Sequence, residues 1–181
     1  MQPTTTLVVM GVSGAGKTTT ALELVRLLSW DYAEGDDFHP AANVEKMRSG
    51  HPLDDDDRWP WLRSLAAWIG GHEQAGRPAI VTCSALKRSY RDLLRDGHPS
   101  VFFVHVSGSA ALLHERVENR QGHYMPPALL DSQLETLEPL QADEPGIRVS
   151  AEGSPHLVAE HVLEALRAAG HAVTASPKES S

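Results

Sequence analysis

The chain has 181 residues, 41% of them hydrophobic, which is enough for one domain with its own core. Its formal net charge of −8 argues against a general nucleic-acid-binding protein, which would carry a basic face. We expect no membrane partner and a cytoplasmic location, since no apolar run reaches membrane-spanning length, a signal peptide is missing, and the single cysteine, Cys83, has no disulfide partner.

The chain opens with a strand, a glycine-rich loop and a helix. Residues 6–10 are apolar and β-branched, as in a buried strand, and residues 18–29 carry apolar side chains at helical spacing. Between them, Gly-Val-Ser-Gly-Ala-Gly-Lys-Thr at residues 11–18 fits the phosphate-loop pattern G-x-x-x-x-G-K-[ST] at every fixed position. Glycines let the backbone wrap around an anion, and the helix N-terminus adds the positive end of its dipole. This pattern predicts a nucleoside triphosphate site.

The loop assigns roles to individual residues. We expect Lys17 to reach the β- and γ-phosphates and the Thr18 hydroxyl to bind Mg²⁺. The predicted strand at residues 79–83 ends without the aspartate that often holds this metal, so metal binding depends on Thr18, on water and, as one option, on Asp36. The predicted nucleotide-binding residues of the loop are Gly11, Val12, Ser13, Gly14, Ala15, Gly16, Lys17, Thr18 and Thr19.

The remaining elements alternate between apolar strands and helices, a pattern typical of a parallel sheet covered on both faces. We predict a P-loop nucleoside-triphosphate fold, an α/β three-layer sandwich that forms a single domain over residues 1–170. Residues 171–181 are small and polar, and we expect a disordered tail. The expected elements are a short strand after residue 30, strands at 79–83, 101–106 and 146–150, and helices at 41–49, 59–74, 84–95, 109–119, 127–136 and 155–169.

Two polar residues follow the predicted strand near residue 30, where ligands bind in open α/β sheets. Asp36 could accept a proton from a substrate hydroxyl or hold Mg²⁺ through water, but a solvated turn aspartate fits equally well. His39 could donate or accept a hydrogen bond with a hydroxylated substrate, or it could be structural.

Charged residues further along leave alternatives open. The carboxylates at residues 54–57 cannot all face one ion, so we favour capping of the next helix. Arg58 could pair with the carboxylate of an anionic substrate or form a salt bridge to this acidic run. Lys87 and Arg91 lie one helical turn apart, and could form an anion site or a solvated face.

Arg116 and Arg120 are also four residues apart, at the end of a predicted helix that leads into a loop with glycine and proline. The helix dipole alone would favour cations there. We favour instead a mobile lid over residues 120–135, which would bring both arginines to the phosphates and exclude water.

Taken together, these segments resemble gluconokinases of the small P-loop type, a family related in fold to shikimate and adenylate kinases. The resemblance extends from about residue 7 to about residue 166, and its matching blocks are residues 11–18, 35–36, 38–40, 43–47, 49–50, 52–58, 60–62, 83–87, 90–95, 120–123 and 133–137. It implies phosphorylation of D-gluconate to 6-phospho-D-gluconate with ATP and Mg²⁺, in a cytoplasmic homodimer.

The resemblance also implies roles for residues. It makes Lys17, Asp36 and Arg120 catalytic and places the acceptor on a helical part at residues 37–78. Arg116 and Arg120 would contact the nucleotide. The acceptor-binding residues that it implies are Asp36, His39, Arg58, Lys87, Arg91, His123 and Gln133. Which of Arg58, Lys87 and Arg91 would hold the gluconate carboxylate stays open.

Two other functions compete with this one. The chain could phosphorylate another small acceptor, such as shikimate or a nucleoside monophosphate, and the dense Asp, Arg and His residues at 36–58 favour a polyhydroxylated acid. It could also be a non-catalytic nucleotide switch. A guanine-nucleotide switch would carry an Asn-Lys-x-Asp motif, which the sequence lacks. It would also carry an Asp-x-x-Gly motif directly after a strand, whereas the match at residues 143–146 precedes a predicted strand.

Overall fold

The computed structural model describes residues 4–119, 127–171 and 173. One parallel sheet has the strand order β2-β3-β1-β4-β5. Its strands are β1 (Thr6–Met10), β2 (Asp31–Ala33), β3 (Ala79–Thr82), β4 (Val101–Ser107) and β5 (Gly146–Ser150). The helices are α1 (Lys17–Leu28), α2 (Ala41–Arg48), α3 (Asp55–Ala75), α4 (Arg88–Arg95), α5 (Ala110–Glu118), α6 (Pro127–Thr136) and α7 (Pro155–Ala168), with a 3₁₀ helix η1 (Gly35–Phe38) after β2.

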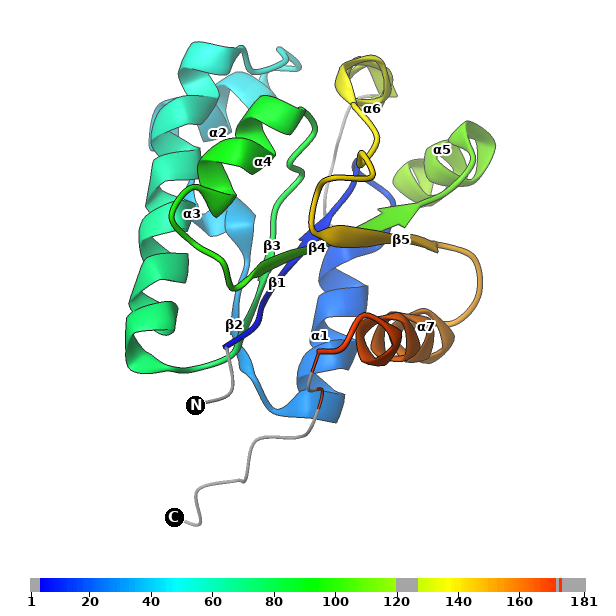
Figure 1. Ribbon diagram of the computed structural model, residues 1–181. Helices are drawn as coiled ribbons and strands as arrows, with labels where there is room; N and C mark the ends of the chain where they lie inside the picture. The colour runs from blue at the N-terminus through cyan, green and yellow to red at the C-terminus, as the bar shows by residue number, and fades with distance from the viewer. Residues whose placement is uncertain (1–3, 120–126, 172, 174–181) are drawn as a thin grey trace.

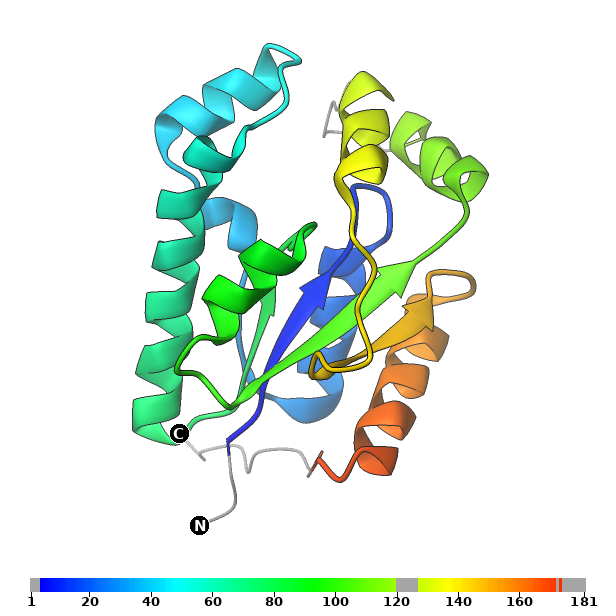
Figure 2. The same ribbon diagram turned by 45° about the horizontal axis from the view of Figure 1, so that its top comes forward.

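Helices cover both faces of the sheet. α1 and α7 pack together on one face, and α3 and α4 pack together on the other (Figures 1 and 2). All five residues of β1 are buried between these layers, as an apolar strand without alternation requires. The predicted three-layer α/β sandwich is therefore confirmed. None of the helices in the described ranges combines the length and the apolar character needed to cross a membrane.

β1 lies at the centre of the sheet, between β3 and β4. Val9 of β1 pairs with Thr82 of β3, and Met10 pairs with His105 of β4. Because the strands are parallel, their carboxyl ends meet at one edge. The loop before α1, the segment after β3 and the chain after β4 therefore come together there, which is where open α/β sheets bind ligands.

The helix expected at residues 84–95 begins later than predicted. α4 starts at Arg88 with Lys87 as its N-cap, because Ala85 has a left-handed backbone (φ +45°) that cannot continue a right-handed helix. The carbonyl of Leu86 instead accepts a hydrogen bond from the Glu138 N–H at 2.7 Å. Ser84, the first residue of the predicted helix, therefore lies in a loop.

The helix expected at residues 59–74 begins earlier than predicted. The Asp54 carboxylate accepts from the Asp57 N–H at 2.8 Å, and the Asp57 carboxylate accepts from the Asp54 N–H at 2.9 Å. This reciprocal pair is a capping box, and α3 starts at Asp55. The predicted capping role of the acidic run is thus confirmed.

Two residues of the expected tail fall within the described part. The His171 ring lies 4.5 Å from that of Phe102, and its Nδ1 is 3.3 Å from the Thr5 hydroxyl oxygen. Val173 is buried. These contacts hold the chain that follows α7 against the amino ends of β1 and β4. Residue 172 and residues 174–181 lie outside the described residues.

Candidate functional site

The phosphate loop connects β1 to α1. Gly14 and Gly16 have φ values of +83° and +86°, in the left-handed region that glycine adopts without steric cost. A Cβ atom on Gly11 would lie 2.7 Å from the Val106 carbonyl oxygen, and one on Gly14 would lie 2.9 Å from the Leu113 carbonyl oxygen. The loop is therefore pressed against β4 and α5 in a way that only glycine permits.

Lys17 reaches back across this loop. Its Nζ donates to the carbonyl oxygens of Gly11 at 3.0 Å and Val12 at 3.2 Å. Since α1 begins at Lys17, the amides of its first turn have no intrahelical acceptor and point toward the loop with the positive end of the dipole. Backbone and ammonium together fit the phosphates of a nucleoside triphosphate.

A carboxylate that sequence reasoning missed lies beside Thr18. The Thr18 hydroxyl donates to Glu34 Oε2 at 2.8 Å, and the Thr82 hydroxyl donates to Glu34 Oε1 at 2.7 Å. The Tyr32 hydroxyl also donates to Glu34. Oxygen ligands of this kind are those that Mg²⁺ prefers, so Thr18 and Glu34 could hold the metal in place of the missing aspartate. A sequence signal for Glu34 was available. Glu34 directly follows a predicted strand, and Asp36 was chosen as a candidate because it lies near the end of the same strand.

Asp36 lies in η1, and backbone contacts fix this turn. The Gly35 N–H donates to the Thr82 hydroxyl oxygen at 3.0 Å, and Trp61 Nε1 donates to the Gly35 carbonyl at 2.8 Å. The pKa of the Cys83 thiol is raised to about 12, mainly by burial. A hydrogen bond from the Ala85 backbone opposes this shift, the charge of Asp36 adds to it, and the charge of Lys17 opposes it. Asp36 and the phosphate-loop lysine are thus both close enough to the end of β3 to act on the same thiol.

His39 is positioned by packing. Its ring stacks on Trp61 with centroids 4.1 Å apart, and its Nε2 lies 3.8 Å from Asp36 Oδ1. Burial lowers the pKa of His39, Asp36 opposes this shift, and Arg58 adds to it. A neutral imidazole beside Asp36 suits hydrogen bonding to a hydroxylated molecule.

Four side chains at the N-terminal ends of α3 and α4 form what we call the acceptor cluster: Asp55, Arg58, Lys87 and Tyr90. Arg58 Nη1 donates to the Tyr90 hydroxyl oxygen at 2.8 Å, and the Tyr90 hydroxyl donates to Asp55. Lys87 Nζ lies 3.1 Å from Asp55 Oδ1, and Arg58 Nη1 lies 3.9 Å from it. The structure therefore brings Arg58 and Lys87 together, although they are far apart in sequence.

Arg91 requires a correction, because it lies inside the protein. Its Nε and Nη2 donate to the two carboxylate oxygens of Glu144 at 2.7 and 3.1 Å, and both side chains are fully shielded from solvent. Its Nη1 donates to the Ala85 carbonyl at 2.9 Å. Arg91 therefore supports the loop before Lys87 and does not contact an acceptor, and the two residues share no helical face because Lys87 precedes the helix.

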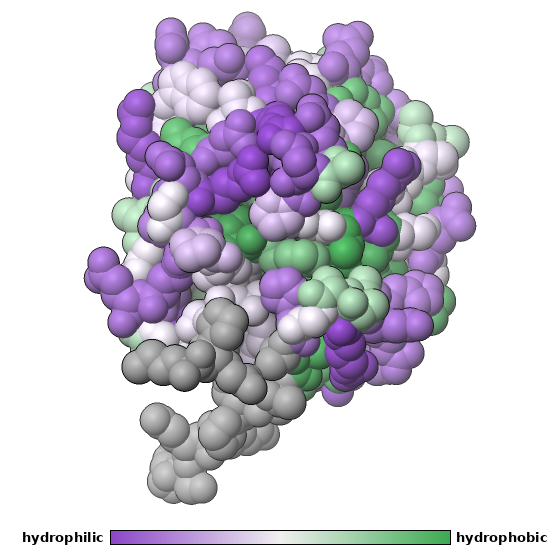
Figure 3. Space-filling model, in the orientation of Figure 1, coloured by the Kyte–Doolittle hydropathy of each residue, from purple (hydrophilic) through white to green (hydrophobic). Residues whose placement is uncertain are grey.

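The surface of α4 differs from its buried side. Hydrophilic side chains gather over α4 on the face drawn in Figure 3. From this helix, Arg88 Nη2 pairs with Asp143 Oδ2 at 2.7 Å. Burial would raise the pKa of Glu144, but its hydrogen bonds from Arg91 and from the Gln141 N–H hold it below the usual range. Exposed and buried ion pairs therefore both tie α4 to the chain before β5.

Residues of α5 and α6 flank the phosphate loop. Arg116 Nη1 would lie 3.7 Å from a Cβ atom built on Gly16, and its Nη2 donates to the Ala151 carbonyl at 2.7 Å. Gln133 Oε1 accepts from the Ser13 N–H at 2.8 Å, so Gln133 touches the nucleotide side of the site. Arg120 and His123 lie outside the described residues, as do residues 120–126 of the expected lid.

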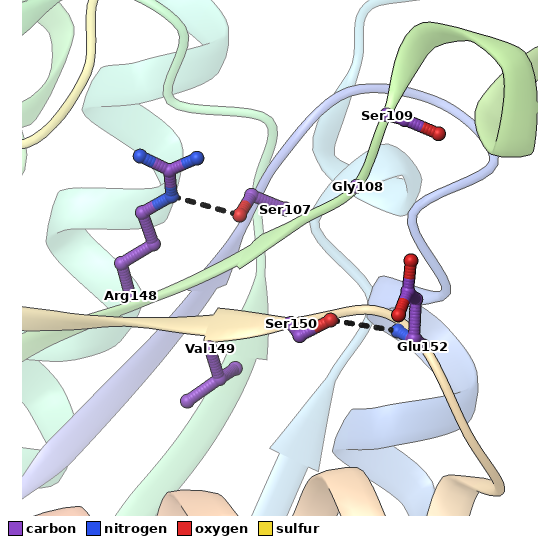
Figure 4. A pocket seen from close by; sticks show the side chains of 7 residues that line it. All are labelled: Ser107, Gly108, Ser109, Arg148, Val149, Ser150 and Glu152. Atoms are coloured by element: carbon purple, nitrogen blue, oxygen red, sulfur yellow. Dashed lines mark hydrogen bonds between the residues drawn. The ribbon is translucent and has the colours of Figure 1, made fainter.

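An open pocket of about 500 Å³ lies at the carboxyl ends of β4 and β5. Figure 4 shows side chains of both strands around it, with Arg148 Nε donating to the Ser107 hydroxyl oxygen at 2.9 Å. The Glu152 N–H donates to the Ser150 hydroxyl oxygen at 3.1 Å in the loop after β5. Because Arg116 binds Ala151 of this loop, the pocket and the phosphate loop share one edge of the sheet.

Comparison with known proteins places this site in a family. A family model described as an AAA domain matches residues 7–140. The gluconokinase of Gluconobacter oxydans (strain 621H) is 51% identical over 162 residues, which cover 90% of this chain and 91% of that protein.

Solved structures agree. An unliganded sugar kinase from Janibacter sp. HTCC2649 matches with a TM-score of 0.88 and 49% identity, covering 96% of this chain and 100% of that one. A gluconokinase from Sinorhizobium meliloti 1021 matches with a TM-score of 0.81 and 41% identity, covering 92% and 93%. The resemblance found in the sequence is confirmed, and the chain belongs to the gluconokinase family of P-loop kinases.

Proposed function

We propose that the protein transfers the γ-phosphoryl group of ATP to the C6 hydroxyl of D-gluconate, which yields 6-phospho-D-gluconate. The observation that carries this proposal is the presence of a complete phosphate loop and a cationic acceptor cluster at the same edge of the sheet. The 51% identity to a gluconokinase supports the choice of acceptor.

The nucleotide would bind through residues 11–19 of the loop and the first turn of α1. Lys17 would contact the β- and γ-phosphates and stabilise charge that develops during transfer. Thr18 and Glu34 would hold Mg²⁺, which neutralises phosphate charge when bound. Arg116 and the pocket beside β4 and β5 would contact the remainder of ATP.

On the acceptor side, Asp36 would accept a hydrogen bond from the C6 hydroxyl and take its proton late in the transfer. Phosphoryl transfer through a loose transition state needs a nucleophile held in line more than it needs a strong base. His39 would hydrogen-bond a neighbouring hydroxyl. Arg58 would bind the carboxylate, because only one of its terminal nitrogens donates to Tyr90 and the planar guanidinium suits bidentate recognition.

Several parts of the proposal come from the sequence. Residues 37–78 would form the acceptor-binding part, and residues 120–135 would form a lid that carries Arg120 as a catalytic residue and His123 as an acceptor contact. Gln133 would hold this lid against the phosphate loop by accepting the hydrogen bond from the Ser13 N–H. We propose a cytoplasmic homodimer that binds neither nucleic acid nor membranes.

A coupled assay of ADP release tests the proposal. The acceptors are gluconate, other sugar acids, shikimate and a nucleoside monophosphate, each with ATP and Mg²⁺. We expect fast turnover with gluconate. Fast turnover with a different acceptor would support the competing kinase, and slow hydrolysis that no acceptor accelerates would support the nucleotide switch.

A further inference from the structure

We propose that Asp55 sets the charge of the acceptor head group that the enzyme selects, so that a monoanionic carboxylate is preferred over a neutral or a dianionic group. The inference rests on the proposed function, because it assumes that the acidic end of the sugar binds at the acceptor cluster.

Asp55 is the shared partner of the groups that could bind an acceptor anion. Lys87 Nζ donates to both Asp55 carboxylate oxygens, at 3.1 and 3.4 Å. The Tyr90 hydroxyl donates to the same carboxylate and accepts from Arg58 at 2.8 Å. The Asp55 carboxylate therefore forms an ion pair with Lys87 directly and is linked to Arg58 through the Tyr90 hydroxyl.

This arrangement leaves one net positive charge on the cluster. Asp55 compensates the charge of one of the two cations. That cation is Lys87, which lies closer to the carboxylate than Arg58 does. Arg58 is the recessed cation, with 12% of its side chain exposed against 33% for Lys87. A substrate with a single carboxylate would balance the remaining charge on Arg58, whereas a dianion would leave one negative charge beside Asp55 without compensation.

A neighbouring cation, Lys46, has its charge fully compensated by carboxylates. Lys46 of α2 lies 2.6 Å from the Asp57 carboxylate and 3.7 Å from that of Asp54. Those two carboxylates leave this lysine no positive surplus. The acceptor cluster differs because two cations share one carboxylate, and this difference sets the charge that it can accept.

A simpler role for Asp55 must be separated from this one. As the first residue of α3, it also stabilises the helix dipole, as any acidic residue of the first turn does. Asp56 follows it in the same turn and is exposed. Asp56→Asn therefore removes the same charge from the same helix end and serves as the matched control for Asp55→Asn.

The experiment uses three acceptors with the same free C6 hydroxyl and different head groups: neutral D-glucitol, monoanionic gluconate and dianionic D-glucitol 1-phosphate. Binding of each is measured by calorimetry, and turnover by coupled ADP release, for the wild type, Asp55→Asn and Asp56→Asn. We expect the Asp55→Asn variant to bind the dianion at least about fivefold more tightly than the wild type, because Lys87 becomes available to it. Gluconate should gain less, and glucitol should not change.

A double variant, Asp55→Asn with Lys87→Met, should lose the gain for the dianion, since the gain depends on the freed ammonium. Dianion binding to Asp55→Asn that is no tighter than to Asp56→Asn would overturn the inference, as would a gain that survives removal of Lys87. Wild-type turnover of gluconate decides the proposed function separately, so failure of the one is distinguishable from failure of the other.

Discussion

The phosphate loop and the acceptor cluster would bind anions through different groups. The loop offers backbone amides whose directions are set by β1, α1 and the glycines between them, with Lys17 as its one charged side chain. The acceptor cluster consists of side chains from α3 and α4 that hold one another through hydrogen bonds and ion pairs.

The difference has a functional consequence. Backbone amides bind any phosphate alike, because every residue type except proline supplies the same N–H group. The acceptor cluster discriminates, because its net charge and the position of Arg58 depend on residue identity. Substitutions in the loop should therefore abolish transfer for all acceptors, and substitutions in the cluster should change which acceptor is used.

The largest effect is expected from Lys17→Met. The ammonium of Lys17 would stabilise charge on the transferred group, and loss of such a preorganised contact lowers kcat by about 10²-fold or more. Arg26→Met, at the other end of α1, serves as a control for loss of a positive charge on the same helix. Steady-state kinetics with saturating gluconate and MgATP measure both, and a Lys17→Met variant with near wild-type kcat would show that the phosphate site is misassigned.

The next effect is expected from Asp36→Asn, which is nearly isosteric. An amide cannot take the proton of the C6 hydroxyl, so kcat should fall by at least about 10²-fold while ATP binding is kept. Asp37→Asn changes the adjacent turn residue and should have little effect. If Asp37→Asn proved to be the damaged variant, the assignment of Asp36 would be off by one residue.

Arg91 tests the support beneath the acceptor cluster. Arg91→Met leaves Glu144 buried without its partner, which typically lowers the free energy of unfolding by about 3–5 kcal/mol. The double variant with Glu144→Met should recover most of this loss, because it removes both charges together. Urea unfolding measures the stability of both variants, and a single variant as stable as the wild type would contradict the buried pair.

The double variant of Arg91 and Glu144 also sharpens the comparison between the two sites. Arg91 donates to the carbonyl of Ala85 in the loop that precedes Lys87. Its loss should therefore raise the KM for gluconate and leave the KM for ATP nearly unchanged. Equal changes in both KM values would mean that the pair supports the whole domain alike.

His105 of β4 pairs with Met10, the last residue of β1 before the phosphate loop, and its Nδ1 has no hydrogen-bond partner within the described ranges. Burial, with smaller contributions from Arg148, Arg91 and Lys17, lowers its pKa to about 4. Between pH of about 6.5 and about 4, the unfolded chain takes up a proton that the folded protein does not. His105 should therefore cost up to about 3 kcal/mol of stability as the pH falls through this range.

The stability of the His105→Gln variant should lack this part of the pH dependence. Urea unfolding of the wild type and the variant at several pH values between 4 and 7 measures the difference. Equal slopes for both proteins would show that His105 titrates alike in the folded and unfolded states.

The sequence alone predicted the phosphate loop well, because the residues that form it are consecutive. The same holds for the order of strands and helices, whose apolar patterns are local. The position of Glu34 after a predicted strand was a signal in the sequence, but its partner Thr18 lies on another element. The two residues bond because α1 packs against β2, which no local pattern indicates.

Arg91 shows where local reasoning failed. Its spacing from Lys87 predicted a shared helical face, but the left-handed backbone at Ala85 delays the start of α4. The pairing with Glu144 depends on a segment 53 residues further along, which no local pattern indicates. The hydrogen bond between Arg58 and Tyr90 joins residues 32 positions apart, so no local pattern indicated it either.

The most direct test of the account measures acceptor choice at Arg58. We compare kcat/KM for gluconate and for D-glucitol, which has the same C6 hydroxyl without the carboxylate, in the wild type and in Arg58→Gln. The account predicts that the variant loses at least about tenfold of the preference for gluconate, while kcat/KM for glucitol and the KM for ATP stay unchanged. An unchanged preference for gluconate would contradict it, because the carboxylate would then bind elsewhere.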